Sequence, residues 1–318
     1  MFKKKLSLLI TCASNKTHIV EYVKNILNRF DAKSMIFTAD KNNKSIIRNF
    51  NYNYLKMPDL LDINKKKIFT FCKKKKIDTI IPTSDLELSF WAKHKDEFNN
   101  SKIFPMISEY KTISLCQNKW LFYKFLKKNK IKTPKSFLGL KEITNKNKKF
   151  VIKENSSFSL HKMNYVNINF TELKKKIHLF KKPIIQECIQ GNEISIDIFV
   201  KNKTIIKKNI IMRRRDMVRF GESEKTIIYK NNSFLKEIFN LLKLFDFDGH
   251  VMFQAIISKK KLFIIECNPR IGGASVSSMV WGLDSVAQFI KSKFNIKYNK
   301  PKLKKSKSMI IYKKTMFI

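Results

Sequence analysis

Glycine and proline are scarce in this sequence, with 7 of each in 318 residues. That scarcity excludes collagen-like and low-complexity proteins, in which these residues dominate. No apolar run approaches the roughly 20 residues that cross a bilayer as a helix, so an integral membrane protein is also excluded. Apolar residues nevertheless make up 43% of the chain and aromatic residues 12%, which is enough to build a core.

Cysteine is scarce too. The five Cys are odd in number, widely spaced and form no Cys-x-x-Cys pair, which favours reduced thiols in the cytoplasm and no structural zinc. The N-terminus has the basic start of a signal peptide, but its apolar stretch Leu6–Ile10 is shorter than the usual core of about 7–15 residues. We therefore expect Leu6–Thr11 to be a buried strand of a cytoplasmic protein.

Acidic residues are few, with 25 Asp and Glu against 66 Lys and Arg, and the net charge is +41. A nucleic acid or an anionic membrane is the obvious partner for such a charge. However, only 7 of the basic residues are Arg, and the lysines occur all along the chain together with many Ile, Asn and Phe, whose codons are rich in A and T. We favour a solvated basic surface without a specific nucleic-acid partner, and 300–314 is the alternative polyanion site.

The first third of the chain alternates strands and helices. Strands are predicted at Leu6–Thr11, Ser34–Ala39, Thr79–Pro82 and Lys102–Ile107, with apolar helical patterns between them, such as Leu86–Phe98. This alternation is typical of a parallel sheet with crossover helices. We expect residues 1–108 to form a doubly wound, Rossmann-like α/β domain.

The rest of the chain mixes helices with antiparallel pairs. Hairpins are predicted for Glu193–Val200 with Thr204–Met212 and for His250–Ile257 with Leu262–Cys267. We expect an α+β domain there.

The second hairpin carries the most informative polar residues. In a strand, Glu266 and Asn268 share one face, opposite Phe263, Ile265 and Cys267. If 259–261 is a three-residue turn, Gln254 lies directly opposite Glu266.

A buried carboxylate at this place needs compensation. A hard divalent cation that bridges Glu266 to nucleotide phosphates would supply it. The ordinary alternative is an ion pair between Glu266 and Arg270, just beyond the strand. Gly272 and Gly273 would let backbone N–H groups approach an anion.

A second segment, 184–197, reads as a strand, a turn at Gly191 and another strand. An adenine ring fits on such a crossover, with backbone hydrogen bonds at Glu187 and Ile189 and the ribose hydroxyls on Glu193. An ordinary strand–turn–strand is the alternative. Lys119 begins a predicted helix and Lys153 ends a predicted strand. In a chain with 59 lysines, neither position alone is evidence for a binding site.

Taken together, these motifs resemble the ATP-grasp superfamily, and in particular one ATP-grasp unit of the carbamoyl phosphate synthetase large chain. The resemblance implies an N-terminal pre-ATP-grasp domain (1–108), a two-lobed ATP-grasp domain (109–295, small lobe about 135–187) and a basic C-terminal segment (296–318). The motifs follow one another in the family's order over about residues 5–290: Ile80–Leu88, Asn118-Lys119, Val151–Lys153, Gln186–Glu193, Gln254 and Glu266–Arg270.

The resemblance also implies roles in nucleotide binding. Lys119 and Lys153 would contact the ATP phosphates. Gln186 and the backbone of Glu187 and Ile189 would hold adenine, and Glu193 would hold the ribose.

The resemblance places the metal and the chemistry beside these residues. Gln254, Glu266 and Asn268 would ligate one or two Mg²⁺ ions, with Mn²⁺ as an alternative and Glu266 as the bridge. Arg270 and Lys153 would act on the transferring phosphoryl group. The implied activity is ATP-dependent ligation of a small carboxylate to an amine through an acyl phosphate, by a protein that is a homodimer in many similar cases.

Four of the seven arginines lie close together in the sequence, at positions 213, 214, 215 and 219. Arg213, Arg215 and Arg219 resemble the basic run of many such ligases and are candidates for binding phosphate or a substrate carboxylate. The alternative is a solvated strand edge.

The chain departs from the family after Lys153, where the usual glycine-rich loop is replaced by 154–162 without glycine. This departure favours a nucleotide-binding scaffold or sensor without turnover as the second hypothesis. A basic nucleic-acid-binding protein is the third.

Overall fold

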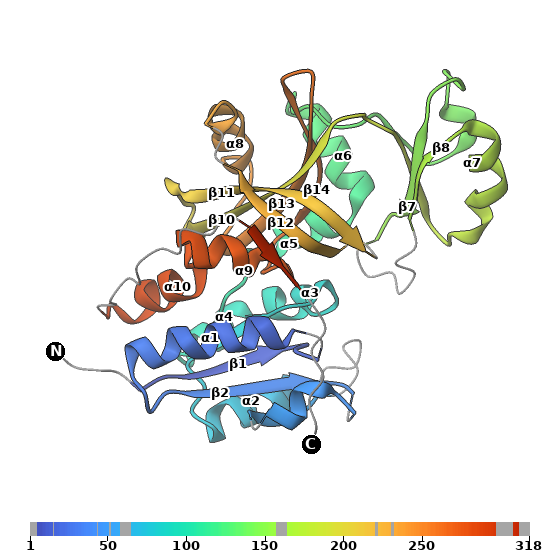
Figure 1. The fold of residues 1–318 in the computed structure, drawn as a ribbon. Coiled ribbons are helices and arrows are strands. Elements are labelled where there is room, and N and C mark those ends of the chain that lie inside the picture. The colour runs from blue at the N-terminus through green and yellow to red at the C-terminus, as the bar shows by residue number, and fades with distance from the viewer. Residues whose placement is uncertain are drawn as a thin grey trace.

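The computed structural model describes residues 5–14, 16–42, 44–50, 52–57, 65–156, 164–219, 222–229, 232–296 and 308–311. For residues 207, 208, 219 and 222 only the backbone is described. The described residues form three sheets, one in the N-terminal region and two in the remainder (Figure 1).

The N-terminal region is built on a parallel sheet of five strands in the order β3-β2-β1-β4-β5. The strands are β1 (Ser7–Thr11), β2 (Met35–Asp40), β3 (Asn53–Lys56), β4 (Thr79–Pro82) and β5 (Phe104–Pro105). The helices are α1 (Thr17–Phe30), η1 (Ile46–Phe50), α2 (Lys65–Lys74), α3 (Asp85–Lys93) and α4 (Lys95–Asn100). This arrangement confirms the expected parallel sheet, although β3 was not predicted and the single helix expected over 86–98 is divided at His94.

A small four-stranded sheet of order β6-β9-β7-β8 stands apart from the rest (Figure 1, upper right). Its strands are β6 (Ser136–Phe137), β7 (Phe150–Glu154), β8 (Tyr165–Ile168) and β9 (Pro183–Glu187). The helices are η2 (Leu140–Glu142), α7 (Phe170–Lys176) and η3 (Ile177–Leu179). This lobe has a separate core, in which Phe150 and Ile152 of β7 pack with Leu173 of α7.

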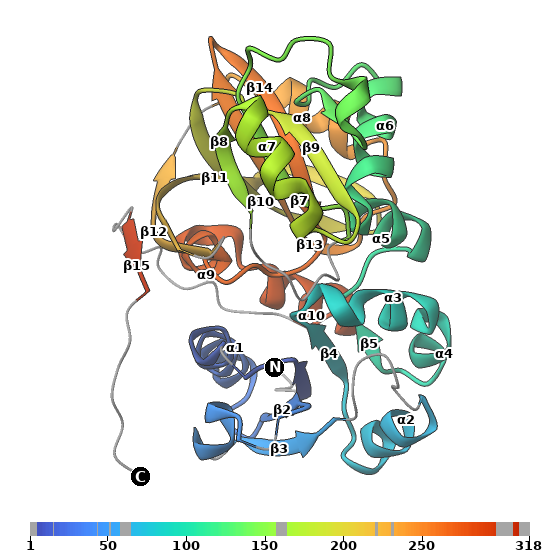
Figure 2. The same ribbon diagram turned by 90° about the vertical axis from the view of Figure 1, so that its right-hand side faces the viewer.

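The largest sheet has six strands in the order β14-β13-β10-β11-β12-β15, and Figure 2 shows it above the N-terminal region. The strands are β10 (Asn192–Lys201), β11 (Thr204–Arg219), β12 (Glu222–Tyr229), β13 (Gly249–Ser258), β14 (Lys261–Asn268) and β15 (Ser308–Ile310). The helices are α5 (Tyr110–Gln117), α6 (Lys119–Lys128), α8 (Leu235–Leu242), α9 (Ser275–Ser278), the π-helical turn η4 (Met279–Leu283) and α10 (Ser285–Phe294).

One face of this sheet is apolar. Ile194, Ile196 and Ile198 occupy alternate positions on β10 and pack with Leu241 of α8 and Phe253 of β13. Since side chains alternate between the two faces of a strand, the residues between them point to the other side. That second face carries the polar residues of the site.

The turn between β13 and β14 differs from the expected one. It contains two residues, Lys259 and Lys260, both in the left-handed region at φ 47° and 58°, and Ser258 pairs with Lys261. A bulge at Ile265 then shifts the register by one residue, so that Gln254 does lie opposite Glu266.

The prediction for this pair is therefore confirmed, although the expected turn was wrong. The bulge also changes the face that packs into the core. Leu262, Ile264 and Cys267 face the core, whereas Phe263 and Ile265 had been expected there with Cys267.

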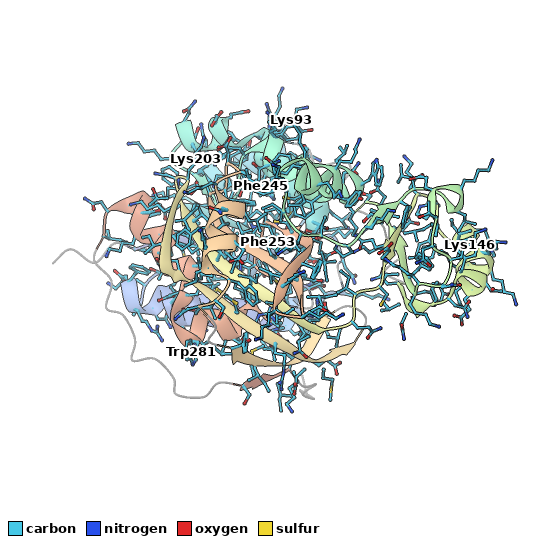
Figure 3. The ribbon with its side chains drawn as sticks, turned by 90° about the horizontal axis from the view of Figure 1, so that it is seen from above. Lys93, Lys146, Lys203, Phe245, Phe253 and Trp281 are labelled. Carbon is cyan, nitrogen blue, oxygen red and sulfur yellow. The ribbon has the colours of Figure 1, made fainter. Side chains whose placement is uncertain are left out.

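Many lysines lie at the surface of the molecule, although Lys95 and Lys153 are buried. In Figure 3, Lys93, Lys146 and Lys203 project outward while Phe253 lies inside. This distribution agrees with the solvated basic surface that the sequence predicts. Most of 300–314, and the glycine-free loop over 157–163, lie outside the described residues. No described helix combines the length and hydrophobicity that a membrane crossing requires.

Candidate functional site

A row of polar side chains crosses the second face of the large sheet. Ser195 of β10 pairs with Gln254 of β13 on one side and with Arg213 of β11 on the other, and Gln254 pairs with Glu266 of β14. Glu193 lies two residues before Ser195 and therefore shares this face. The sheet thus gathers the residues that the sequence predicted from distant segments.

Glu266 and its neighbours form a set of oxygen donors. The Asn268 amide Nδ2 donates to Glu266 Oε1 at 3.3 Å, which leaves the amide oxygen of Asn268 available. Among the described residues, no three His, Cys, Asp or Glu side chains gather as a metal-binding group. One carboxylate and two amide oxygens still suit a hard divalent cation whose other ligands are phosphate oxygens and water.

Lys153 reaches this donor set from the small lobe. Its Nζ lies 3.8 Å from Glu266 Oε2, and its side chain is 7% exposed. Burial lowers the pKa of Lys153 to about 8, although Glu266 acts in the opposite direction. Burial alone would raise the pKa of Glu266, but Lys153, Lys119 and the Asn268 amide hold it below its ordinary value. Glu266 is therefore an anion at neutral pH.

Lys119 is the first residue of α6 and is tied to the end of β7. Its backbone N–H donates to the Asn155 carbonyl at 2.9 Å, and the Trp120 N–H donates to the Asn155 side chain at 2.7 Å. The Asn118 side chain caps the helix. These bonds bring the two predicted phosphate-binding lysines to adjacent segments, and the charge of Lys119 accordingly acts on the pKa values of Lys153 and Glu266.

The predicted adenine segment is already partly hydrogen-bonded. Gln186 is 3% exposed, and its amide donates to Ser136 Oγ at 3.0 Å. The Glu187 N–H donates to the Lys135 carbonyl at 2.8 Å, and the Glu187 carboxylate pairs with Lys148. Adenine binding at Glu187 would therefore use its carbonyl oxygen. Ile189 is half-buried on the segment that follows β9.

The arginines of β11 divide between the site and the interior. Arg215 Nη1 lies 2.8 Å from Glu193 Oε1, so Arg215 stands beside the predicted ribose ligand. Arg213 is 1% exposed, and its Nε donates to Asp197 at 2.6 Å. The structure therefore corrects the expectation that Arg213 contacts a ligand, because its guanidinium is buried against a carboxylate. For Arg219 only the backbone is described.

Arg270 is paired with the N-terminal region. Its Nε donates to Asp85 Oδ1 at 2.9 Å, and its Nη2 contacts the other carboxylate oxygen. The alternative ion pair between Arg270 and Glu266 is therefore wrong, since Glu266 pairs with Lys153. The Gly272 N–H donates to Ser275 Oγ at 3.0 Å, so in this structure it is not directed at an anion.

Sequence reasoning missed a buried network beneath the site. Asp197 is fully buried, accepts hydrogen bonds from Arg213, Ser275 and Ser278, and lies 3.2 Å from His250 Nε2. The only sequence signal was an Asp inside a run of alternating isoleucines. The network joins the sheet to α9, which follows Arg270 in the chain.

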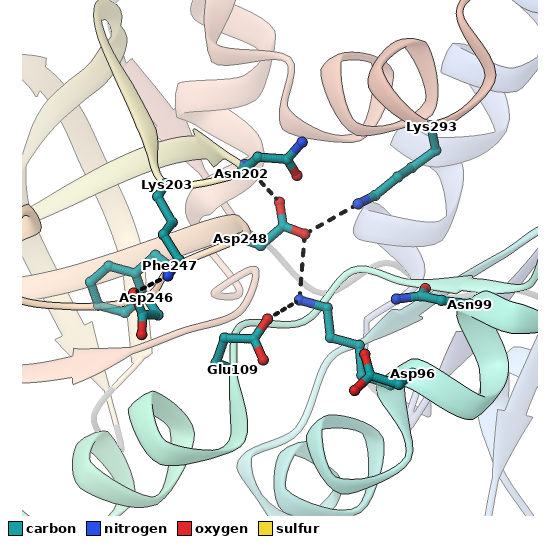
Figure 4. A pocket seen from close by; sticks show the side chains of 10 residues that line it. Asp96, Asn99, Glu109, Asn202, Lys203, Asp246, Phe247, Asp248 and Lys293 are labelled. Carbon is teal, nitrogen blue, oxygen red and sulfur yellow. Dashed lines mark hydrogen bonds and ion pairs between the residues drawn. The ribbon is translucent and has the colours of Figure 1, made fainter.

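A separate pocket of about 320 Å³ lies at the opposite end of β10 (Figure 4). Lys95 of α4 and Lys293 of α10 both approach Asp248, at 3.5 and 3.3 Å, and Lys95 also pairs with Glu109. Asn202 at this pocket and Glu193 at the site are nine residues apart, or roughly 30 Å along a strand. The pocket therefore belongs to the junction between the regions of the chain and not to the predicted nucleotide site.

Solved structures with the same fold include several ATP-grasp ligases. An L-amino acid ligase from Bacillus licheniformis is 16% identical, with a TM-score of 0.70 over 92% of this chain and 75% of that one. A biotin carboxylase from Campylobacter jejuni is 15% identical, with a TM-score of 0.68 over 96% and 74%. The N5-carboxyaminoimidazole synthetase from Staphylococcus aureus is 14% identical, with a TM-score of 0.66 over 93% and 80%.

These identities show a shared fold. A search of curated protein sequences finds no match. Residues 8–107 match a PylC-like N-terminal domain, and residues 116–274 match an ATP-grasp domain. The second match spans half of the 318 residues, and the chain therefore belongs to the ATP-grasp family.

Proposed function

We propose that the chain is an ATP-dependent ligase that joins a carboxylate to an amine through an acyl phosphate and releases ADP and phosphate. The observation that carries this proposal is the approach of Lys153, from the small lobe, to within 3.8 Å of Glu266 on the large sheet. Crystal structures of similar fold include an L-amino acid ligase and a 2-oxoglutarate carboxylase domain in complex with MgADP and bicarbonate. The family and the site favour the same class of reaction.

Glu266, Asn268 and Gln254 fit Mg²⁺ or Mn²⁺, because their donor atoms are hard oxygens around an anionic carboxylate. The bound cation would supply positive charge against the nucleotide phosphates. Lys153 and Lys119 would add charge from the small lobe and from the start of α6. Lys153 is buried beside Glu266, and Lys119 is fixed through its backbone N–H to Asn155, so that little reorganisation is required when the phosphates bind.

The nucleoside would lie on the segment between β9 and β10. The Glu187 carbonyl would accept from the adenine amino group, and the Ile189 N–H would donate to a ring nitrogen. Gln186 would line the same side, held by Ser136. Glu193 is 39% exposed at its side chain and would accept both ribose hydroxyls, with Arg215 fixing its position.

In the first step, a carboxylate oxygen attacks the γ-phosphorus, and the bond to the ADP oxygen breaks. Lys153 and Arg270 stabilise the charge on the transferring phosphoryl group. In the second step, the amine attacks the acyl carbon, the carbon–oxygen bond breaks and phosphate leaves with the electron pair of that bond, while the amine nitrogen gives up a proton to the departing phosphate. No covalent intermediate with a protein nucleophile is required.

The test of the nucleotide site is calorimetry with MgATP on the wild type and on Glu266→Ala. We expect submillimolar binding that weakens by at least about tenfold in the variant, since a metal ligand and its charge are lost. Glu237→Ala is the matched control, because Glu237 is exposed on α8 behind the sheet. No MgATP binding by the wild type would refute the ligase proposal.

The scaffold hypothesis predicts MgATP binding without phosphate release for any acid and amine. We further propose that the substrates are small molecules and that the protein acts in the cytoplasm, which the five free thiols favour. A homodimer stays a prediction from the family resemblance.

A further inference from the structure

Lys16 lies between β1 and α1, at the carboxyl end of the N-terminal sheet. Its Nζ donates to the carbonyl oxygen of Thr83 and, at 3.1 Å, to the Thr83 hydroxyl, just beyond β4. The strand order β3-β2-β1-β4-β5 changes direction between β1 and β4. In open α/β sheets, ligands bind outside the carboxyl ends of the strands at such a point. Lys16 therefore stands where the topology itself predicts a ligand.

The contacts of this ammonium group do not offset its charge. Both of its hydrogen-bond acceptors are uncharged, and no carboxylate of the described residues forms an ion pair with it. Burial, and after it the charge of Arg270, lower the pKa of Lys16 to about 8, while Cys12, Glu87 and Asp85 act in the opposite direction. A neutral donor would join the two segments with a smaller desolvation penalty. A cation at this place therefore indicates an anionic partner that binds from outside.

The segments around Lys16 are fixed in place. The buried Glu87 carboxylate accepts from the N–H groups of Thr83 and Ser84 and from the indole N–H of Trp91, at 2.8 to 3.1 Å. On the other side, Cys12 adopts a left-handed conformation at φ 53°. For a residue other than glycine this conformation costs about 1–2 kcal/mol, and such costs concentrate at functional sites.

Arg270 approaches the same edge from the large sheet. His18, in the first turn of α1, lies with its Nε2 2.8 Å from the Gly273 carbonyl, so the segment after β14 packs against the start of α1. Arg270 itself is bound to Asp85, two residues after Thr83. Lys16 and Arg270, from different parts of the chain, thus bind residues only two positions apart beyond β4, close enough for the charge of Arg270 to lower the pKa of Lys16.

We propose that Lys16 and Arg270 together hold the carboxylate group of the acid that is ligated, at the carboxyl ends of β1 and β4. This inference rests on the proposed ligase function. Arg270 follows the predicted metal ligand Asn268 by two residues, so an acid held between the two cations has an oxygen near the phosphate-binding residues. The occupant is a small free carboxylic acid, because an ester or an amide lacks the negative charge that would offset the Lys16 ammonium group.

The test measures phosphate release from MgATP with hydroxylamine as the amine. The acids are the twenty standard L-amino acids and a set of small hydroxy and dicarboxylic acids, and the methyl esters of active acids serve as neutral probes. The variants are Lys16→Gln and Lys16→Arg, with Lys33→Gln as a control that removes an exposed lysine of the same region. For each acid that stimulates the wild type, Lys16→Gln is expected to raise the KM for the acid by at least about tenfold, the effect of losing one charge-assisted contact.

The same variant is expected to leave the KM for ATP within about twofold, and Lys16→Arg to recover part of the loss. An unchanged KM for the acid in Lys16→Gln would overturn the inference, as would an equal rise in the KM for ATP or stimulation by the methyl esters. MgATP calorimetry on each variant shows that it is folded. If the wild type binds MgATP but no acid stimulates it, the carboxylate subsite is refuted while the nucleotide site stands. If it does not bind MgATP, the ligase proposal itself has failed.

Discussion

Asp85 and Arg270 are 185 residues apart in the sequence and form a two-contact ion pair that joins the N-terminal region to the end of β14. Both side chains are 17% exposed. Arg270 stands two residues beyond Asn268, so this pair fixes the direction in which the proposed catalytic arginine leaves the strand. The N-terminal region thereby contributes to the site on the large sheet.

Asp85→Asn is expected to lower the rate of phosphate release by about tenfold, which corresponds to about 1.4 kcal/mol, because Arg270 loses its charged partner. The affinity for MgATP should stay within about twofold, since Asp85 is not among the proposed nucleotide ligands. Steady-state kinetics and calorimetry measure the two effects. Asp96→Asn, an exposed position on α4, is the control. An equal loss of nucleotide affinity would show that the pair supports the nucleotide site instead.

Asp197 is expected to make stability depend on acidic pH. Burial alone would raise its pKa, but Arg213, His250 and Ser275 hold the pKa well below its usual range. The stabilisation is therefore fully present above the ordinary value near 4 and is lost as pH falls below it.

Asp197→Asn should lower the free energy of unfolding by about 3–5 kcal/mol at neutral pH, because Arg213 stays buried without its counter-ion. Urea denaturation from pH 3 to 8 should show this difference narrowing below about pH 4. Asp246→Asn removes an exposed ion pair with Lys203 and should cost less than about 1 kcal/mol. A difference that does not vary with pH would contradict the ionic origin of the effect.

The arrangement of Gln254 and Glu266 shows how far the sequence predicts the site. Pairing across the hairpin, with an assumed three-residue turn, predicted that Gln254 lies opposite Glu266, and it does, although the turn has two residues. The sequence offers no signal for the bulge at Ile265, because a bulge depends on packing against neighbouring strands and not on local preference. The two-residue turn at Lys259 and Lys260 could not be predicted either, because Asn and Gly, and not Lys, usually occupy left-handed positions in such turns.

The sequence predicts the positions of buried charged residues better than it predicts which residues they pair with. Arg213 and Arg215 share a face of β11, yet one is buried against Asp197 and the other pairs with Glu193. Arg270 pairs with Asp85, which lies far away in the sequence. Periodicity predicts the face on which a side chain lies, but the pairing depends on how the sheets and helices pack together.

Gly191 should be intolerant of a larger side chain. A Cβ at this position would lie 2.4 Å from the Ile257 carbonyl oxygen, because the turn before β10 passes close to the end of β13. Gly191→Ala should therefore destabilise the protein by about 1–3 kcal/mol in urea denaturation. It should also weaken MgATP binding, since the turn adjoins the proposed adenine segment. Gly139→Ala is the matched control, as its Cβ would meet its nearest neighbour at 3.7 Å. Equal stability of the two variants would contradict the close approach.

Glu193 should determine how the protein distinguishes ATP from 2′-deoxy-ATP. Its carboxylate is held by Arg215 at 2.8 Å and is exposed enough to accept a hydroxyl hydrogen bond. A hydrogen bond to a charged group contributes about 1.5–3 kcal/mol, so we expect the wild type to prefer ATP by at least about tenfold in competition calorimetry. Glu193→Gln should reduce this preference to about twofold, because an uncharged amide is the weaker acceptor, whereas Glu237→Gln should not change it. If Glu193→Gln weakened both nucleotides equally, the carboxylate would act by holding Arg215 in place and not by binding the ribose.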